Sequence, residues 1–185
     1  MLSLPNKMSV RRKKMPPGAA EIAVFGMLGA LMFASKLALS ALPNVHLCGV
    51  FIVACTVVYR SRALYPIYVF VFLTGLFEGG FNAWWLPYLY IWLPLWALAL
   101  LLPRRAPSWL LTSLSMLLGA THGILYGILY APAQALFFKM DFQMTVAWVL
   151  SGTPFDILHA AGNLSACALT VPLVKLLLRL EKGFR

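Results

Sequence analysis

Charged residues are scarce in this chain. Only 11% of its 185 residues are charged and 62% are hydrophobic, whereas soluble domains carry about 25% charged residues. The mean hydropathy is +0.84. This composition favours a membrane-embedded fold over a soluble one, because a bilayer core about 30 Å thick needs about 20 apolar residues for each helical crossing.

Other absences exclude several functions. No glycine-rich phosphate loop ending in Gly-Lys-Ser/Thr is present, so the chain has no ATPase site of its own. The net charge is +10, but the basic residues lie between apolar segments and not on one polar face, which argues against nucleic acid as a partner. No nucleophile, base and orienting group share a convincing spacing, so we expect no enzymatic activity and no cofactor. The three cysteines lack a CxxC spacing and lie in apolar stretches, so we assign no redox or metal role to Cys48, Cys55 and Cys167.

The apolar stretches predict an all-α integral membrane protein with six transmembrane helices. Residues 1–18 form a basic cytoplasmic head, and residues 19–185 form a single six-helix domain. We interpret Phe142–Leu150 as an interfacial helix or an extension on the outer side, and Pro154 as the first turn of the last span, because proline suits that position. The expected spans are Ala19–Leu42, Val45–Tyr59, Ala63–Phe81, Trp84–Leu102, Trp109–Ala131 and Pro154–Leu180.

The distribution of basic residues predicts that both termini are cytoplasmic. Every second connection is basic, as the positive-inside rule requires. The basic positions are the head (Lys7, Arg11–Lys14), Arg60 and Arg62, Arg104 and Arg105, and the C-terminal Lys175, Arg179, Lys182 and Arg185. The intervening connections are Pro43–Asn44, Gly79–Ala83 and a segment in which Lys139 is balanced by Asp141.

Small residues recur at every fourth position of the first span, at Gly26, Ala30, Ala34 and Ala38. Such a ridge lets another helix approach closely, and in lipid this close packing is a principal source of helix association. Packing within the chain itself would use the same ridge, so periodicity alone leaves the partner open.

Three polar residues share one face of the last span. Asp156, His159 and Asn163 lie at relative positions 0, 3 and 7. An ionisable group in a membrane is costly and usually faces a bundle interior or a wet cavity, so this stripe is a candidate binding site. A structural hydrogen-bond network is the alternative. A metal site is not expected, because a third ligand at a recognisable spacing is missing.

A second polar and aromatic group follows the third span. It begins with Glu78 and Asn82 and continues with Trp84, Trp85 and Tyr88. An interfacial aromatic belt would explain the rings but not the carboxylate and the amide. We therefore expect this group and the Asp156 stripe to close over one outward-facing pocket. Other candidates for this pocket are Lys36, the His122–Tyr126 pair on the fifth span, and Asn44 with His46 in the first outer connection.

The pattern as a whole resembles the S component of an energy-coupling factor (ECF) transporter, the membrane subunit that captures a vitamin or related micronutrient. The resemblance covers most of the chain, and its most specific part is Gly152–Asn163. The other parts are the Ala30-xxx-Ala34 ridge, the Leu42–His46 turn and the Trp84–Trp92 aromatic block.

The resemblance implies a six-helix bundle in a prokaryotic plasma membrane and a pocket near its outer face. It also implies that the first-span ridge docks on a transmembrane coupling subunit, which two cytoplasmic ATPases complete. The S component would then topple in the membrane to release its ligand.

The identity of the ligand stays open at this stage. Aromatic rings with Asp156 and Glu78 favour a flat heterocycle bearing donors or positive charge, whereas Lys36 and His159 would suit a carboxylate or phosphate. Two other functions compete with the importer subunit. A membrane scaffold would bind no saturable ligand, and a small secondary carrier would couple uptake to an ion gradient without an ATPase.

Overall fold

The computed structural model describes residues 18–42, 44–103 and 106–183, and this part of the chain contains helices and no strands. The basic head, except for Gly18, lies outside the described residues, as do Arg104, Arg105 and Arg185. The helices are α1 (Ala19–Ala38), α2 (Cys48–Tyr59), η1 (Arg60–Ala63), α3 (Leu64–Phe77), η2 (Leu86–Leu89), α4 (Trp92–Ala99), α5 (Ser108–Ile124), α6 (Tyr126–Phe138), α7 (Phe142–Cys167) and α8 (Thr170–Gly183).

Three helical stretches of the described chain are long and apolar enough to cross a membrane: Ala19–Ala38, Cys48–Phe77 and Ser108–Phe138. The pair α7 and α8, bent by 54° at a short break, makes a fourth if it counts as one span. The prediction of an apolar, all-helical membrane protein is thereby confirmed at this level. Six crossings and the side on which the termini lie stay predictions.

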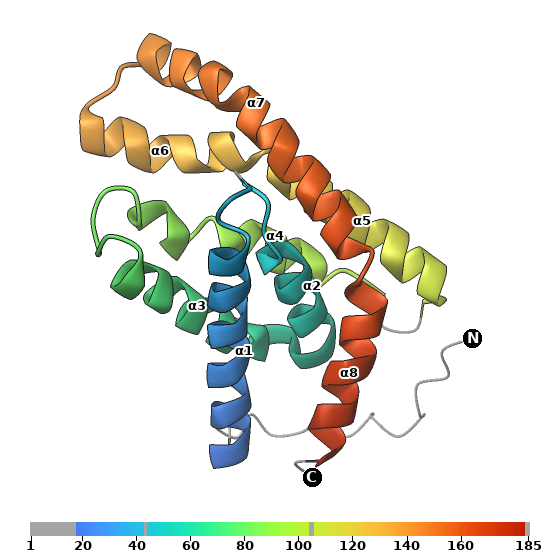
Figure 1. Cartoon of the computed structure of the whole chain (residues 1–185). Helices are drawn as coiled ribbons and strands as arrows, with labels where there is room; N and C mark the ends of the chain where they lie inside the picture. The colour runs from blue at the N-terminus through green and yellow to red at the C-terminus, as the bar shows by residue number, and fades with distance from the viewer. Residues whose placement is uncertain (1–17, 43, 104–105, 184–185) are drawn as a thin grey trace.

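The helices pack in pairs (Figure 1). α1 lies along α3, α2 packs on α8, and α5 lies along α7. α6 and the first half of α7 form an antiparallel arm that extends away from the other helices. The first turn of α1 and the last turn of α8 lie at the same end of the molecule.

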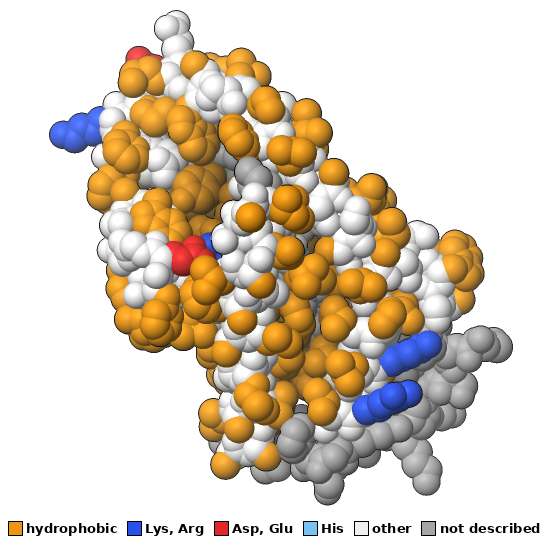
Figure 2. All heavy atoms as spheres, viewed as in Figure 1, with side chains coloured by type: hydrophobic (Ala, Val, Ile, Leu, Met, Phe, Trp, Pro, Cys, Tyr) orange, Lys and Arg blue, Asp and Glu red, His pale blue; other side chains and the backbone are white. Residues whose placement is uncertain are grey.

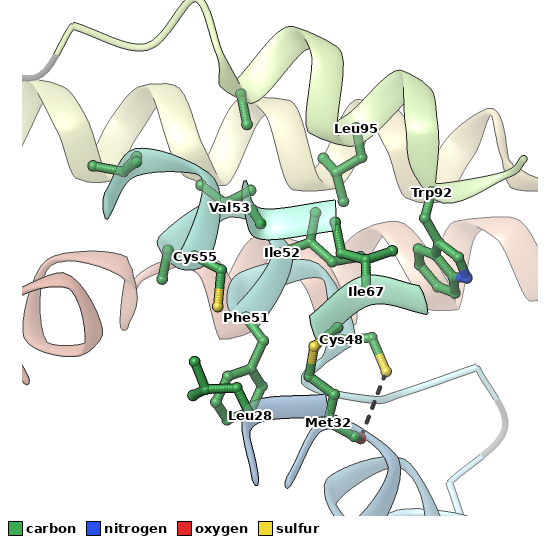
Figure 3. Close-up of a cluster of buried hydrophobic side chains, with 14 of the residues drawn as sticks. Leu28, Met32, Cys48, Phe51, Ile52, Val53, Cys55, Ile67, Trp92 and Leu95 are labelled. Carbon is green, nitrogen blue, oxygen red and sulfur yellow. Dashed lines mark hydrogen bonds between the residues drawn. The ribbon is translucent and has the colours of Figure 1, made fainter. Parts of the chain in front are cut away.

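The core is built around α2, every residue of which from Cys48 to Val57 is buried. Figure 3 shows Met32 of α1, Ile67 of α3 and Leu95 of α4 gathered around this helix, whose Ile52 lies among them. Trp92 closes the core on one side with only 1% of its surface exposed.

The outer surface is apolar as well. Figure 2 shows hydrophobic side chains over most of the visible face, with basic side chains gathered beside α8. Leu136 and Phe142 on the arm are 84% and 82% exposed. A continuous apolar surface of this extent suits lipid as the surrounding solvent.

Three glycines let α5 and α6 approach α7 closely. A Cβ added at Gly123 would lie 2.6 Å from the backbone of Ala160, and one at Gly119 would lie 2.6 Å from Cys167 Sγ. At Gly127 it would clash with the Asp156 carboxylate. Glycine at every fourth position therefore permits a close contact of α5 and α6 with α7, and our sequence prediction missed this stripe.

The predicted alanine ridge of α1 faces outward. Ala30, Ala34 and Ala38 are exposed, and a Cβ added at Gly26 would meet no atom within 4 Å. α1 packs against α3 through Gly29, where a Cβ would lie 2.6 Å from Val69. The packing among the described helices thus leaves the ridge uncovered.

The expected start of the last span at Pro154 is wrong, because α7 runs without interruption from Phe142 to Cys167 and contains Pro154. Asp141 caps its N-terminus, with the carboxylate accepting a hydrogen bond from the Met144 amide at 2.7 Å. This side-chain cap supplies a start signal, whereas proline only removes one hydrogen bond inside the helix. The segment from 154 to 180 is also not one straight helix, since the chain bends between α7 and α8.

The other predicted spans were too long at their ends. α1 stops at Ala38 and α3 at Phe77, where a turn follows in which Gly79 and Gly80 adopt φ of 95° and 90°. Glycine reaches such positive φ without steric cost. Residues 84–91 form turns and η2, so the regular part of the fourth predicted span is α4, with eight residues. Conversely, α6 continues the fifth span to Phe138 after a break at Leu125.

We predict that Gly123→Ala destabilises the protein by about 1–3 kcal/mol, because the added methyl group collides with the backbone of α7. Gly152→Ala on α7 is the matched control, since nothing lies within 4 Å of its added Cβ. Thermal unfolding of detergent-purified variants measures both. Equal melting temperatures for the two variants would show that the close contact of α5 with α7 is not formed.

Candidate functional site

A cavity of about 370 Å³ opens between the end of α1, the connection to α2 and the start of α6. This volume lies in the range of small-molecule sites, about 300–1,000 Å³. Six of the predicted site residues line it: Lys36, Asn44, His46, Glu78, Tyr88 and Tyr126. These residues come from five separate segments of the sequence, so the fold brings together much of the predicted pocket.

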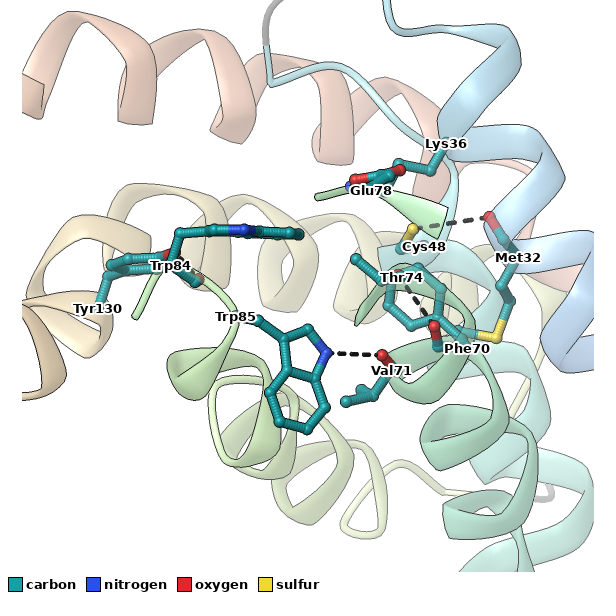
Figure 4. A network of polar contacts seen from close by, with 10 residues as sticks. All are labelled: Met32, Lys36, Cys48, Phe70, Val71, Thr74, Glu78, Trp84, Trp85 and Tyr130. Atoms are coloured by element: carbon teal, nitrogen blue, oxygen red, sulfur yellow. Dashed lines mark hydrogen bonds and ion pairs between the residues drawn. The ribbon is translucent and has the colours of Figure 1, made fainter. Parts of the chain in front are cut away.

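An ion pair between Lys36 and Glu78 forms part of the cavity wall (Figure 4). Both side chains are largely shielded from solvent, with 17% and 24% of their surface exposed. The Lys36 ammonium also lies 5.5 Å from the centre of the Tyr88 ring, within the range of a cation–π interaction. Two predicted pocket residues from distant parts of the sequence are therefore paired with each other.

Aromatic and imidazole rings form a cluster beside the cavity, and two of its members, His46 and Tyr126, also line the cavity. The ring centres of His46 and Tyr126 are 4.7 and 4.6 Å from that of His159. The ring of His122 stacks on Trp92 at 5.5 Å, and its Nε2 lies 2.9 Å from the Ile91 carbonyl oxygen. All three histidines of the sequence thus belong to one buried cluster.

Several polar atoms of this cluster have no hydrogen-bond partner although they are buried. They are both ring nitrogens of His159, Nδ1 of His46 and of His122, Nε1 of Trp92, and both amide atoms of Asn163. Leaving a buried donor or acceptor unpaired costs about 1–3 kcal/mol. Such a concentration at one place is typical of a site that a polar ligand or water completes.

His46 lies in the connection between α1 and α2. Burial lowers the pKa of its imidazole to about 4, and the neighbouring charge of Lys36 acts in the same direction. At neutral pH His46 is therefore uncharged and offers one donor and one acceptor nitrogen.

The predicted stripe of α7 points toward three different neighbours. Asp156 faces Gly127, whose amide donates to both carboxylate oxygens at 3.2 and 3.3 Å. His159 belongs to the ring cluster, and Asn163 lies deeper, with its side chain next to Gly49 on α2. Of the three, His159 is the residue in contact with rings that line the cavity.

Seven predicted site residues do not line the cavity, so the expectation that the Asp156 stripe closes over it is wrong: they are Asp156, His159, Asn163, His122, Asn82, Trp84 and Trp85. Asn82 stabilises its own turn: its amide nitrogen donates to the Gly79 carbonyl at 2.9 Å, and its oxygen accepts from the Trp84 amide. The Trp85 indole nitrogen donates to the Val71 carbonyl at 2.8 Å (Figure 4). Trp84 packs edge-on against Tyr88, and its carbonyl accepts a hydrogen bond from the Tyr130 hydroxyl.

Trp92 is central to the ring cluster, although we did not predict it as a site residue. Its ring contacts those of His46, Tyr88, His122 and Tyr126. The signal was available, because Trp92 shares a face with Tyr88 in the aromatic block. In the described part of the chain, no three His, Cys, Asp or Glu side chains are arranged to hold a metal ion.

Comparison with known proteins gives no match: no family model, curated protein or solved structure is significantly similar to this chain.

We predict that Asn163→Leu raises the stability of the ligand-free protein by about 1–3 kcal/mol, because it replaces two unpaired polar atoms with methyl groups of similar shape. The same substitution at Asn82, whose amide is hydrogen-bonded, should lower stability. Thermal unfolding in detergent measures both. A loss of stability in Asn163→Leu comparable to that in Asn82→Leu would indicate that Asn163 is a structural residue.

Proposed function

We propose that the chain is the substrate-capturing S component of an ATP-driven ECF-type importer in a prokaryotic plasma membrane. It would bind a vitamin-like small molecule in the cavity at the end of α1 and dock through α1 on a transmembrane coupling subunit. Two ATPase subunits would supply the energy, and this chain would perform no covalent chemistry. In this proposal the two halves of Cys48–Phe77 and the short Leu86–Ala99 segment bring the crossings to six.

The observation that carries the proposal is the cavity backed by buried, unpartnered polar atoms. A scaffold needs hydrogen bonds that are satisfied between its own helices, because unpaired groups weaken it. Here the His159 and Asn163 side chains are 1% exposed and make no such bonds. An apolar-walled cavity with a few polar groups is the usual form of a small-molecule site.

The positions of the basic residues support the proposed orientation. Arg62 pairs with Glu21 in the first turn of α1, and Arg60 donates to the Leu100 carbonyl at the end of α4. The connection after α2 thus contacts both the start of α1 and the end of α4, which leads into the next predicted cytoplasmic connection. Lys36 of the cavity lies 15 residues farther along α1 than Glu21, about 22 Å at 1.5 Å per residue. The cavity therefore lies at the end of the bundle away from these arginines.

The outward-facing ridge of α1 supports docking on another helix. Its alanines are exposed while the neighbouring Val24, Phe25 and Leu28 are buried. Small side chains on an exposed helical face permit the close approach on which helix association in lipid depends.

We expect native mass spectrometry of gently purified protein to detect a bound small molecule. His46→Ala removes an imidazole that lines the cavity and should weaken the binding of this molecule by about 1–3 kcal/mol, the scale of one lost buried hydrogen bond or stacking contact. Gly152→Ala serves as a control outside the cavity. Empty protein in every preparation, with no thermal shift against vitamins and nucleobases, would favour a scaffold.

We also predict that Ala30→Trp and Ala34→Trp abolish co-purification with the coupling subunit and uptake, while ligand affinity of the isolated chain stays unchanged. Leu136→Trp, an equally lipid-accessible change on the α6 arm, should leave assembly intact. Intact assembly in both alanine variants would exclude the ridge as the docking surface. Uptake that needs an ion gradient and no ATPase would instead identify a secondary carrier.

A further inference from the structure

The charged groups of the cavity wall neutralise each other. Lys36 and Glu78 are the charged residues that line it, and they are paired. Asp156 is held by the Gly127 amide and is not among the lining residues. The remaining polar groups of the wall are a hydroxyl of serine, an amide, two phenols and the His46 imidazole.

This pairing makes a ligand with a net charge unfavourable. An anion that approaches Lys36 also meets the negative charge of Glu78, and a cation that approaches Glu78 also meets the positive charge of Lys36. The pair therefore gives a charged ligand little net attraction to offset the loss of its hydration, and separating the pair to gain that attraction would leave a partly buried charge without its partner. A ligand without net charge leaves the pair intact.

The ring cluster defines the shape and the hydrogen bonding of the ligand. Tyr88 and Tyr126 present aromatic rings at the cavity, and His46 offers an unpartnered Nδ1. An uncharged imidazole provides one donor and one acceptor. The complementary ligand is therefore flat and carries at least one uncharged group that donates or accepts a hydrogen bond.

We propose that the cavity selects a planar heterocycle of zero net charge, and that the Lys36–Glu78 pair enforces this selection. The proposal rests on the proposed function, since it assumes that the cavity binds a small molecule. Of the two ligand classes that the sequence left open, the proposal keeps the flat heterocycle with hydrogen-bond donors, without a positive charge, and excludes the carboxylate or phosphate.

The test uses three probes of nearly equal shape: nicotinamide, nicotinate and N1-methylnicotinamide, which are neutral, anionic and cationic. Binding to the detergent-purified full chain is measured by calorimetry at pH 7. Wild-type protein should prefer nicotinamide over both charged probes by roughly tenfold or more.

Substitutions of the ion pair should redirect this preference. Glu78→Gln leaves Lys36 unpaired and should shift the preference toward nicotinate, whereas Lys36→Met should shift it toward N1-methylnicotinamide. The double variant has no charge on the wall and should again prefer nicotinamide, which controls for loss of folding.

A wild-type preference for a charged probe overturns the proposal, and so does an order that the single substitutions leave unchanged. If none of the probes binds, the ligand retained in native mass spectrometry decides: an uncharged ligand supports the proposal, and a charged one overturns it. Absence of any retained ligand and of any probe binding would refute the proposed function itself, and this selectivity with it.

Discussion

The close contact of α7 with α5 and α6 determines where the candidate site lies. Gly123 brings the backbone of α5 against that of α7, and Gly119 and Gly127 leave room for the Cys167 and Asp156 side chains of α7. The polar residues of α7 are thereby placed against the ring cluster and not against lipid. In a bilayer, apolar burial does not drive helices together, so packing of this kind has to supply the association. A bulkier residue at these positions would move His159 away from Tyr126 and His46.

The general class of the protein could be predicted from composition, but the limits of its helices could not. Apolar residues continue through spans and connections alike, so hydropathy does not mark where α1 stops at Ala38 or where the chain bends after Cys167. A side chain that can cap a helix marks the start of a helix better than hydropathy does. Asp141 has the side chain of a helix cap, and it outweighed Pro154 as a start signal for α7.

The cavity residues were predicted better than the helices that carry them. Lys36, His46 and Glu78 are polar groups in apolar surroundings, and the cost of burying them makes such residues meet in space. Trp85 and Asn82 were predicted for the same site because amphipathic residues near a span end look alike in sequence. Only the structure distinguishes those that hydrogen-bond to their own turn or to α3 from those that face the cavity.

Pro154 lies between an exposed and a packed part of α7. Its missing N–H leaves the Leu150 carbonyl without its usual helical partner, and a helix bends more easily at such a point. On one side lies the exposed arm that begins at Phe142, and on the other lies the segment from Asp156 to Asn163. If α7 bends between its exposed arm and its glycine-packed half, we therefore expect the bend at residues 150–154.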